Sequence, residues 1–250
     1  EMAYLPDELL PLLPAMPDHP SKLTLTPLPP AVVVEVSPAN SVILDVTCML
    51  LAALRFENPR EYLAKTAVTP FKWTLFEALL LGTGVLDQAN QPTALARKFL
   101  DLPRALALKW LANQWLKSSA FHEIRCLPDL QIEATSPIPS QAARQTIIDL
   151  LSHLQEGFWY SLDDFIDLLK STEPDFLRKQ EEYFSWVILK DGNLQEPLSG
   201  YESWLQVEGA LITFIITQML PELALIDIGT LKDLPSKRLF RLKENFFTLN

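Results

Sequence analysis

The sequence predicts a mainly α-helical protein with short β-hairpins, an α+β fold divided into two lobes. Two observations lead to this prediction. Apolar residues recur at helical spacing in both halves of the chain, and in each half a strand-like segment and a turn follow the helical segments. The chain also contains only 7 glycines but 20 prolines, a composition that disfavours a sheet of many hairpins and marks helix ends and linkers.

The prolines divide the chain into four parts. Residues 1–40 are expected to form a Pro-rich arm, in which the β-branched stretch Ala31–Val36 predicts a short strand or an extended segment. Residues 41–127 form the first lobe and residues 140–250 the second. The Pro-containing residues 128–139 are interpreted as the linker between them, because few contacts are expected to cross such a segment.

The first lobe is expected to begin with a buried helix over Val42–Leu54, capped by Asn40 or Ser41. Thr69 followed by Pro70 is a start signal for a helix that ends at Gly82. The other predicted elements are a helix opened by Pro59, a short strand at Gly84–Leu86, a turn at Asp87–Asn90, a closing element at Pro92–Leu100 and a long helix at Pro103–Leu116. Three helices followed by a strand and a turn is the element order of a winged helix.

The second lobe repeats this order. Ser161 is expected to cap a helix that carries Asp164 at its third position. Trp204–Leu220 predicts the longest apolar helix. The other predicted elements are a helix at Ser140–Leu154, a segment that starts at Pro174, a strand-like stretch at Phe184–Leu189, a strand at Leu223–Ile228, a turn or wing at Gly229–Ser236 and a return strand at Leu239–Leu249. The sequence therefore predicts tandem winged-helix lobes.

Several segments together resemble a family of largely uncharacterised bacterial winged-helix proteins. These proteins are related to the N-terminal region of XPB-type DNA helicases and are often labelled helicase-associated. The matching segments are Tyr4–Leu10 with Leu13 and Pro14, Asp45–Leu54, Trp159–Ile166 with Pro174–Arg178, and Gly200–Trp204 with Glu208–Ile212. The resemblance implies two winged helices within a longer polypeptide and supplies no catalytic residues. The chain has no Gly-x-x-x-x-Gly-Lys-Ser/Thr loop, so helicase activity is not expected.

A DNA-reading winged helix places its third helix in the major groove and uses basic or amide side chains there. The first candidate helix, Pro70–Leu81, offers only Lys72, and the second, Ser203–Leu220, has no Lys or Arg and carries Glu208. The net charge of −10 also opposes encounter with nucleic acid. One basic group departs from this pattern and could contact a DNA backbone: Lys232, Lys237, Arg238, Arg241 and Lys243. The other interpretation is a solvated basic edge that balances nearby acids or protects an edge strand.

No catalytic, cofactor or metal site is predicted. The histidines, His19, His122 and His153, are never three or four residues apart, so they form no helical metal pair. Serines 161 and 203 are interpreted as helix caps rather than nucleophiles. The acids Asp163, Asp164 and Asp167 suit a helix N-terminus better than a cation. Five tryptophans are assigned to the core rather than to a stacking platform: Trp110, Trp115, Trp159, Trp186 and Trp204.

The remaining features favour a cytoplasmic protein. Cys48 and Cys126 both lie in apolar stretches and are interpreted as small buried side chains. The most apolar segment, Ala210–Leu220, is too short to span a bilayer. The sequence thus favours a non-catalytic scaffold that binds a protein partner within a larger nucleic-acid-associated protein. The alternative is a module that contacts the DNA backbone through the last wing, and no small-molecule substrate or membrane partner is expected.

Overall fold

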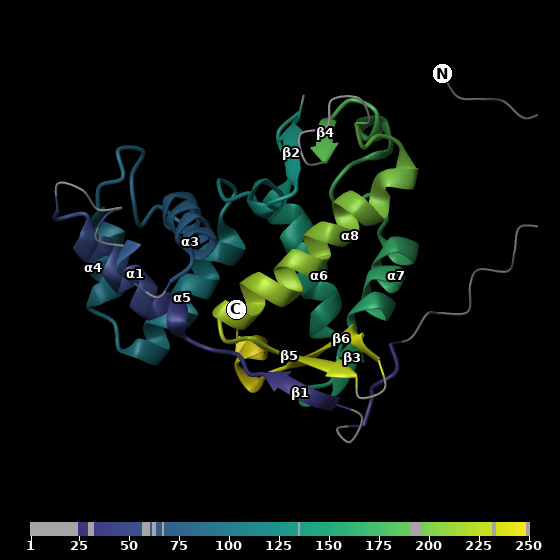
Figure 1. Ribbon diagram of the computed structural model, residues 1–250, viewed down its shortest axis with the longest axis horizontal. Coiled ribbons are helices and arrows are strands. Elements are labelled where there is room, and N and C mark those ends of the chain that lie inside the picture. The colour runs from purple at the N-terminus through teal and green to yellow at the C-terminus, as the bar shows by residue number, and fades with distance from the viewer. Residues whose placement is uncertain are drawn as a thin grey trace, which may run out of the picture.

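The computed structural model describes residues 25–29, 33–56, 61, 64–66, 68–134, 136–190, 197–231 and 234–248. These residues form an α+β fold of helices and two small antiparallel sheets, as the composition and periodicity predict. Figure 1 shows a helical lobe from the first half of the chain beside a lobe that contains all of the strands. The predictions for Tyr4–Pro14, His19, Pro59 and Lys232 lie outside the described residues.

The helical lobe contains α1 (Val42–Ala53), α3 (Pro70–Gly82), α4 (Ala94–Leu100) and α5 (Arg104–Lys117). The predicted cap of α3 is confirmed, because the Thr69 hydroxyl accepts the Lys72 N–H at 3.4 Å. At α1 the Asn40 carboxamide accepts the Val42 N–H at 3.0 Å, whereas Ser41 makes no side-chain cap. The predicted strand at Gly84–Leu86 is reduced to one bridge, between Leu86 and Pro92.

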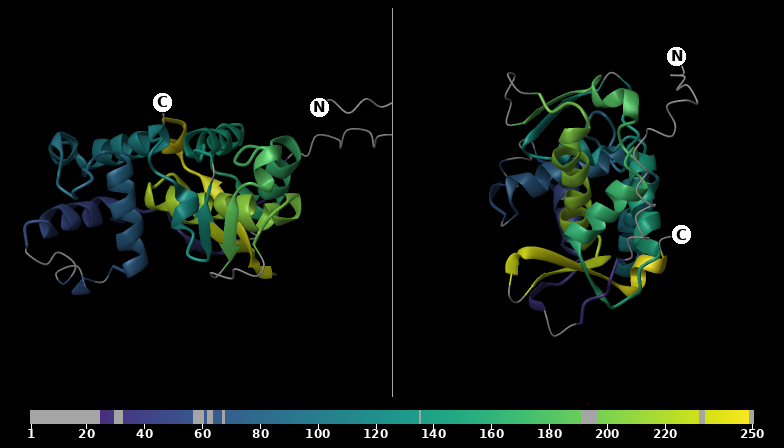
Figure 2. Two further views of the ribbon diagram at one scale, coloured as in Figure 1. Left: turned by 90° about the horizontal axis from the view of Figure 1, so that it is seen from above. Right: turned by 90° about the vertical axis from the view of Figure 1, so that its right-hand side faces the viewer.

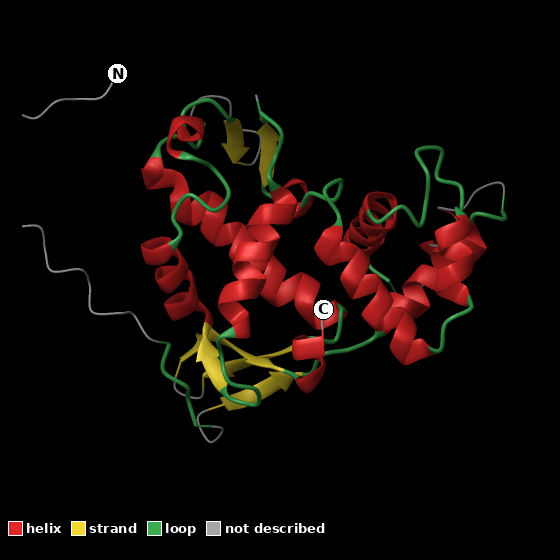
Figure 3. Ribbon diagram, turned by 180° about the vertical axis from the view of Figure 1, so that it is seen from behind, coloured by secondary structure: helices red, strands yellow, loops and turns green. Residues whose placement is uncertain are grey.

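The second lobe follows the order α6 (Ser140–Ser152), β3 (Trp159–Ser161), α7 (Leu162–Thr172), α8 (Trp204–Phe214), β5 (Ile226–Leu231) and β6 (Leu234–Leu242). The Ser161 hydroxyl caps α7 by accepting the Asp164 N–H at 3.2 Å, as predicted. A π-helical turn, Ile215–Met219, and α9 (Leu220–Glu222) continue α8 without a break. Figure 3 shows the strands of the larger sheet beneath the helices of this lobe.

The larger sheet has the strand order β1-β5-β6-β3, and all of its pairs are antiparallel. Its first strand, β1 (Val33–Ser37), comes from the predicted arm and pairs with β5. The smaller sheet pairs β2 (Leu130–Glu133) with β4 (Val187–Lys190). Figures 1 and 2 show α6, α7 and α8 between the two sheets. The arm and the predicted linker therefore both supply strands to the second lobe, because their apolar residues find partners from much later in the chain.

The predicted C-terminal hairpin is wrong in its boundaries. The wing was expected at Gly229–Ser236, but β5 continues to Leu231 and β6 already begins at Leu234. The predicted return strand, Leu239–Leu249, ends at Leu242 and is followed by a 3-10 helix over Glu244–Thr248. Pairing with β5 explains the early start of β6, since Leu234 lies opposite Leu231. β3 pairs only with Leu239–Arg241, so Lys237 and Arg238 lie where β6 has β5 as its one described strand partner.

One continuous hydrophobic core joins the two lobes. Four of the tryptophans assigned to the core are buried in the structure, namely Trp115, Trp159, Trp186 and Trp204. The fifth, Trp110, is partly buried against Phe99 at a ring distance of 6.1 Å. Between the lobes, the Lys72 ammonium contacts the Glu222 carboxylate. The two lobes therefore share one core and an ion pair.

The helix Tyr201–Glu222 is longer than the segment Ala210–Leu220 that the sequence singled out. By length and composition alone it could cross a membrane, although 67% of its most apolar window is buried inside the fold. A core helix of a water-soluble protein has the same properties. Its length therefore does not decide between the two settings.

Candidate functional site

A groove of about 670 Å³ runs along the outer face of α8 and its π-helical extension. Its floor is formed by residues that repeat every four positions along this helix, and that spacing places their side chains on one helix face. The floor residues are Leu205, Gly209, Ala210, Thr213, Phe214, Thr217 and Gln218. The walls come from α3, α7, β6 and the segment Leu127–Asp129, so elements of both lobes build the groove.

Several residues on the floor of the groove have short side chains or none. Gly209 is buried, and a Cβ placed there would lie 3.6 Å from the Leu205 side chain and 3.7 Å from that of Ile166. These are ordinary van der Waals distances, so the backbone there has room for a methyl group. Ala210 and Thr213 extend the row of short side chains along the helix. The middle of the groove is therefore lined by short side chains.

Large apolar side chains are exposed on this floor and beside it. Leu205 is 53% exposed and Phe71, at the start of α3, is 37% exposed. The Phe71 ring packs edge-on against Phe214, with ring centroids 6.4 Å apart. Two hollows adjoin the groove and share Leu127 and Pro128 with it; one lies against α3 and the other against Lys190 of β4. The result is a continuous apolar surface rather than an isolated exposed side chain.

Among the described residues that line the groove and its two adjoining hollows, cations outnumber anions. Arg238 lines the main groove, Arg125 lines the hollow against α3, and Lys190 lines the hollow against β4. All three are exposed, and no described carboxylate lies within ion-pair distance of any of them. Asp129 is the one acid that lines the described part of these three hollows. The groove and its two adjoining hollows taken together thus carry more cations than acids among their described lining residues, in a chain whose net charge is −10.

Three of the residues predicted to contact DNA have acidic partners in the structure. Arg241 donates to the Asp227 carboxylate at 2.6 Å and lies over the Trp159 ring at 4.7 Å. Lys243 lies 3.9 Å from the same carboxylate. Lys237 lies 3.5 Å from Asp164. These contacts match the interpretation of a basic edge that balances nearby acids.

Of the described members of that basic group, Arg238 alone lacks an acidic partner. Lys232 lies outside the described residues. Arg238 therefore belongs to the groove as well as to the hairpin of β5 and β6.

Asp227 is a structural carboxylate that the sequence did not single out. Burial alone would raise its pKa, but the Ala39 N–H, at 2.8 Å, and the cations of Arg241 and Lys243 together hold the pKa below its ordinary value. The ionised carboxylate ties the end of the arm to β5 and β6. Arg241 is therefore engaged within the fold and is not a free cation for a phosphate.

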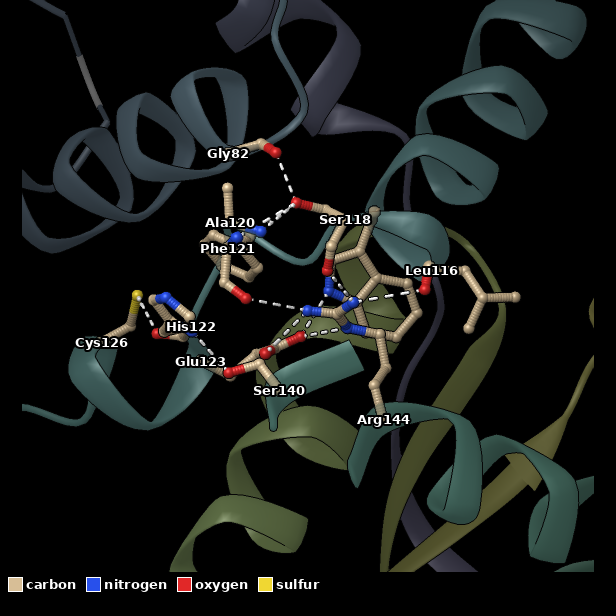
Figure 4. A network of polar contacts seen from close by, with 11 residues as sticks. Gly82, Leu116, Ser118, Ala120, Phe121, His122, Glu123, Cys126, Ser140 and Arg144 are labelled. Carbon is tan, nitrogen blue, oxygen red and sulfur yellow. Dashed lines mark hydrogen bonds and ion pairs between the residues drawn. The ribbon is translucent and has the colours of Figure 1, made fainter. Parts of the chain in front are cut away.

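The most extensive polar network is buried where the two lobes meet (Figure 4). Arg144 of α6 is 0% exposed and donates to the Glu123 carboxylate at 2.5 and 3.0 Å. Its remaining N–H groups donate to three backbone carbonyls, those of Leu116, Ser118 and Phe121. All five donors of the guanidinium thus have partners. Arg144 ties α6 to the chain that follows α5.

A second buried ion pair overturns the role expected for Glu208. The sequence counts this acid against DNA binding by the helix, but Arg178 donates to it at 2.6 and 2.7 Å inside the fold. Burial raises the pKa of Glu208, and Arg178 opposes that shift. Ser203 accepts a further N–H of Arg178 at 3.1 Å and makes no side-chain cap for α8, contrary to the prediction.

His122 and Cys126 lie close together beside the Arg144 network, where the Cys126 thiol contacts the His122 carbonyl at 3.7 Å (Figure 4). His122 contacts the Ser140 hydroxyl at 2.6 Å through Nδ1, and burial, Arg125 and Arg144 lower its pKa. The prediction of a buried Cys48 is wrong, because this side chain lies off the buried face of α1 and is exposed. Cys126 is partly buried, which raises its pKa to about 12. No cluster of three or more potential metal ligands occurs among the described residues.

Comparison with known proteins gives no relative for this chain. No family model matches it, and no curated protein or solved structure matches it either.

Proposed function

We propose that this chain is a non-catalytic scaffold that binds a segment of another protein in the α8 groove. In this proposal the second lobe is a winged helix, and the chain acts in the cytoplasm within a larger nucleic-acid-associated protein. The order α6, β3, α7, α8, β5, β6, with β3 paired to β6, supports the winged helix. The resemblance of Trp159–Ile212 to helicase-associated proteins supports the same proposal.

The single observation that carries the proposal is the walled, apolar groove. In a winged helix that reads DNA, the helix in the position of α8 enters the major groove, which is about as wide as one helix. Here that face is bordered by residues of α3, α7, β6 and the segment Leu127–Asp129. Its exposed stripe carries Leu205 and no Lys or Arg. These features fit a protein segment better than a base edge.

Selection from a displayed library of random peptides tests this function. We expect selection against the wild-type protein to converge on peptides with apolar residues at i, i+3 or i+4, and i+7. These peptides should bind the Leu205→Asp variant at least about tenfold more weakly than the wild-type protein, because the substitution places a charge in the apolar groove.

Leu106→Asp is the matched control. Leu106 lies on α5 outside the groove and is 54% exposed, against 53% for Leu205. It should leave binding unchanged. A library that never converges, or peptides that bind Leu205→Asp as tightly as wild type, would contradict the proposed function.

A second candidate function is contact with the DNA backbone through the hairpin of β5 and β6. The exposed Arg238, which has no described acidic partner, favours it. A mobility-shift assay with duplex DNA at low salt separates the two functions. Binding that weakens steeply with salt and is lost in Arg238→Ala would support DNA as the partner and count against the scaffold.

A further inference from the structure

We infer that the occupant of the α8 groove is an acidic amphipathic helix from a partner protein. This inference rests on the proposed function and adds the chemistry of the partner. Three properties of the groove support it: its length, the spacing of its floor and the sign of the charge around it.

The length of the groove suits a short helix. The floor runs from Leu205 to Gln218, which corresponds to about 20 Å at the helical rise of about 1.5 Å per residue. A partner helix of about 14 residues has the same length. Its apolar side chains would contact Leu205 and Phe71, which are 53% and 37% exposed.

The spacing of the floor residues also suits a helical partner. Gly209, Thr213 and Thr217 repeat every four residues, so their short side chains form one straight depression along α8. Two helices pack closely when the side-chain ridge of one enters such a groove on the other. An extended strand would instead need free backbone donors and acceptors, and those of a helix are already paired.

The charges around the groove select an acidic partner. Arg238 is exposed in the groove, Arg125 and Lys190 are exposed in the two hollows that adjoin it, and Asp129 is the one described acid among the lining residues of all three. Carboxylates on the polar face of a bound helix would meet these cations. A nucleic acid would satisfy the same cations but would leave Phe71, Leu205 and Leu127 without apolar partners.

The test uses fluorescence anisotropy of the full chain with two labelled peptides. Each peptide has about 14 residues and leucines at i, i+3, i+4 and i+7. One carries glutamates and the other lysines at the remaining positions. We expect the acidic peptide to bind more tightly, and its affinity to fall between about 50 mM and about 500 mM salt, where exposed charges become screened.

Charge reversal then locates the site. The triple variant Arg125→Glu, Lys190→Glu and Arg238→Glu should weaken the acidic peptide by at least about tenfold. The control reverses the same number of exposed charges outside the groove, with Arg97→Glu, Lys98→Glu and Lys109→Glu, and should change the affinity much less. The far-ultraviolet circular dichroism of both variants verifies that they fold.

The possible outcomes separate the inference from the proposed function. Tighter binding of the lysine peptide, with loss in Leu205→Asp, overturns the acidic partner but keeps the groove. Equal binding of the acidic peptide to the two triple variants, or no binding of either peptide, also overturns the inference. If duplex DNA displaces the acidic peptide from the wild-type protein, and the groove triple variant no longer binds that DNA, the cations would be assigned to nucleic acid. The peptide library decides the proposed function independently of these results.

Discussion

Arg144 shows how one side chain can hold two parts of a chain together. Its guanidinium joins Glu123 and three carbonyls near the end of α5 to α6. Replacing Arg144 with Met removes these donors and leaves a buried carboxylate without its counter-ion. We expect Arg144→Met to lower the free energy of unfolding by about 3–5 kcal/mol, measured by urea denaturation.

Two further variants test whether this loss of stability comes from breaking the pair of Arg144 and Glu123. Gln141→Met, on an exposed position of the same helix, should change stability by less than about 0.5 kcal/mol. Adding Glu123→Gln to Arg144→Met should cost less than the sum of the single changes, because the buried charge disappears with its partner. Strict additivity would show that Arg144 and Glu123 do not act as a pair.

His122 predicts a dependence of stability on pH. Burial and the nearby Arg125 and Arg144 lower the pKa of its imidazole in the folded protein. The unfolded chain therefore binds this proton more readily, with a pKa of about 6.5. The stability that comes from neutral His122 is present above that pH and is lost as the pH falls toward the folded pKa.

Urea denaturation of wild type and His122→Asn at about pH 7 and about pH 5 measures this contribution. The wild-type protein should lose more stability than the variant on acidification. Equal losses in the two proteins would mean that another group carries the dependence.

Buried charged residues were harder to predict than helix caps. The caps at Thr69 and Ser161 depend on residues two or three positions away, so the sequence predicted them. The partner of Arg144 lies far along the chain. One signal was nevertheless present, because Arg144, Ile147, Ile148 and Leu151 share one helix face and are all buried. A single charge on an apolar face predicts a buried partner elsewhere.

At the scale of elements, two helical glycines should respond in opposite ways to the same substitution. At Gly209 a Cβ finds ordinary contacts, so Gly209→Ala should raise the free energy of unfolding by about 0.5–1 kcal/mol through higher helix propensity. At Gly82 a Cβ would lie 2.6 Å from the Phe121 Cβ and 2.8 Å from its Cα. Gly82→Ala should therefore destabilise the fold by at least about 1 kcal/mol.

The two thermal unfolding midpoints, measured against wild type, test this contrast. The expected order is Gly209→Ala above wild type and Gly82→Ala below it. A decrease for both variants would show that the floor of the α8 groove is packed more tightly than its contacts indicate.

Helices were predicted more closely than strands, for a physical reason. The start of α3 and the end at Gly82 follow from local signals, and the structure reproduces them. Strand boundaries depend on partners that the local pattern does not contain. β6 begins at Leu234 because that residue pairs with Leu231 of β5, and β2 forms inside the predicted linker because β4 lies beside it. The α8 groove could not be predicted, because its walls come from distant segments.

At the scale of the molecule, the lobes should unfold together. Their apolar residues form one core, and Lys72, Arg144 and the first residues of β1 connect segments far apart in sequence. We expect tryptophan fluorescence and far-ultraviolet circular dichroism to give one coincident urea transition. Two separate transitions would instead support the independent lobes that the linker at residues 128–139 suggested.

The proposed function requires that a partner bind in the α8 groove. Titration of the ¹⁵N-labelled chain with the acidic peptide, followed by amide chemical shifts, measures this directly. We predict that the changes cluster on α8 between Leu205 and Gln218, at Phe71 and along Leu127–Asp129. Changes concentrated on other surfaces, such as α4 or the exposed edge of β1, would contradict the claim that the α8 groove is the binding site.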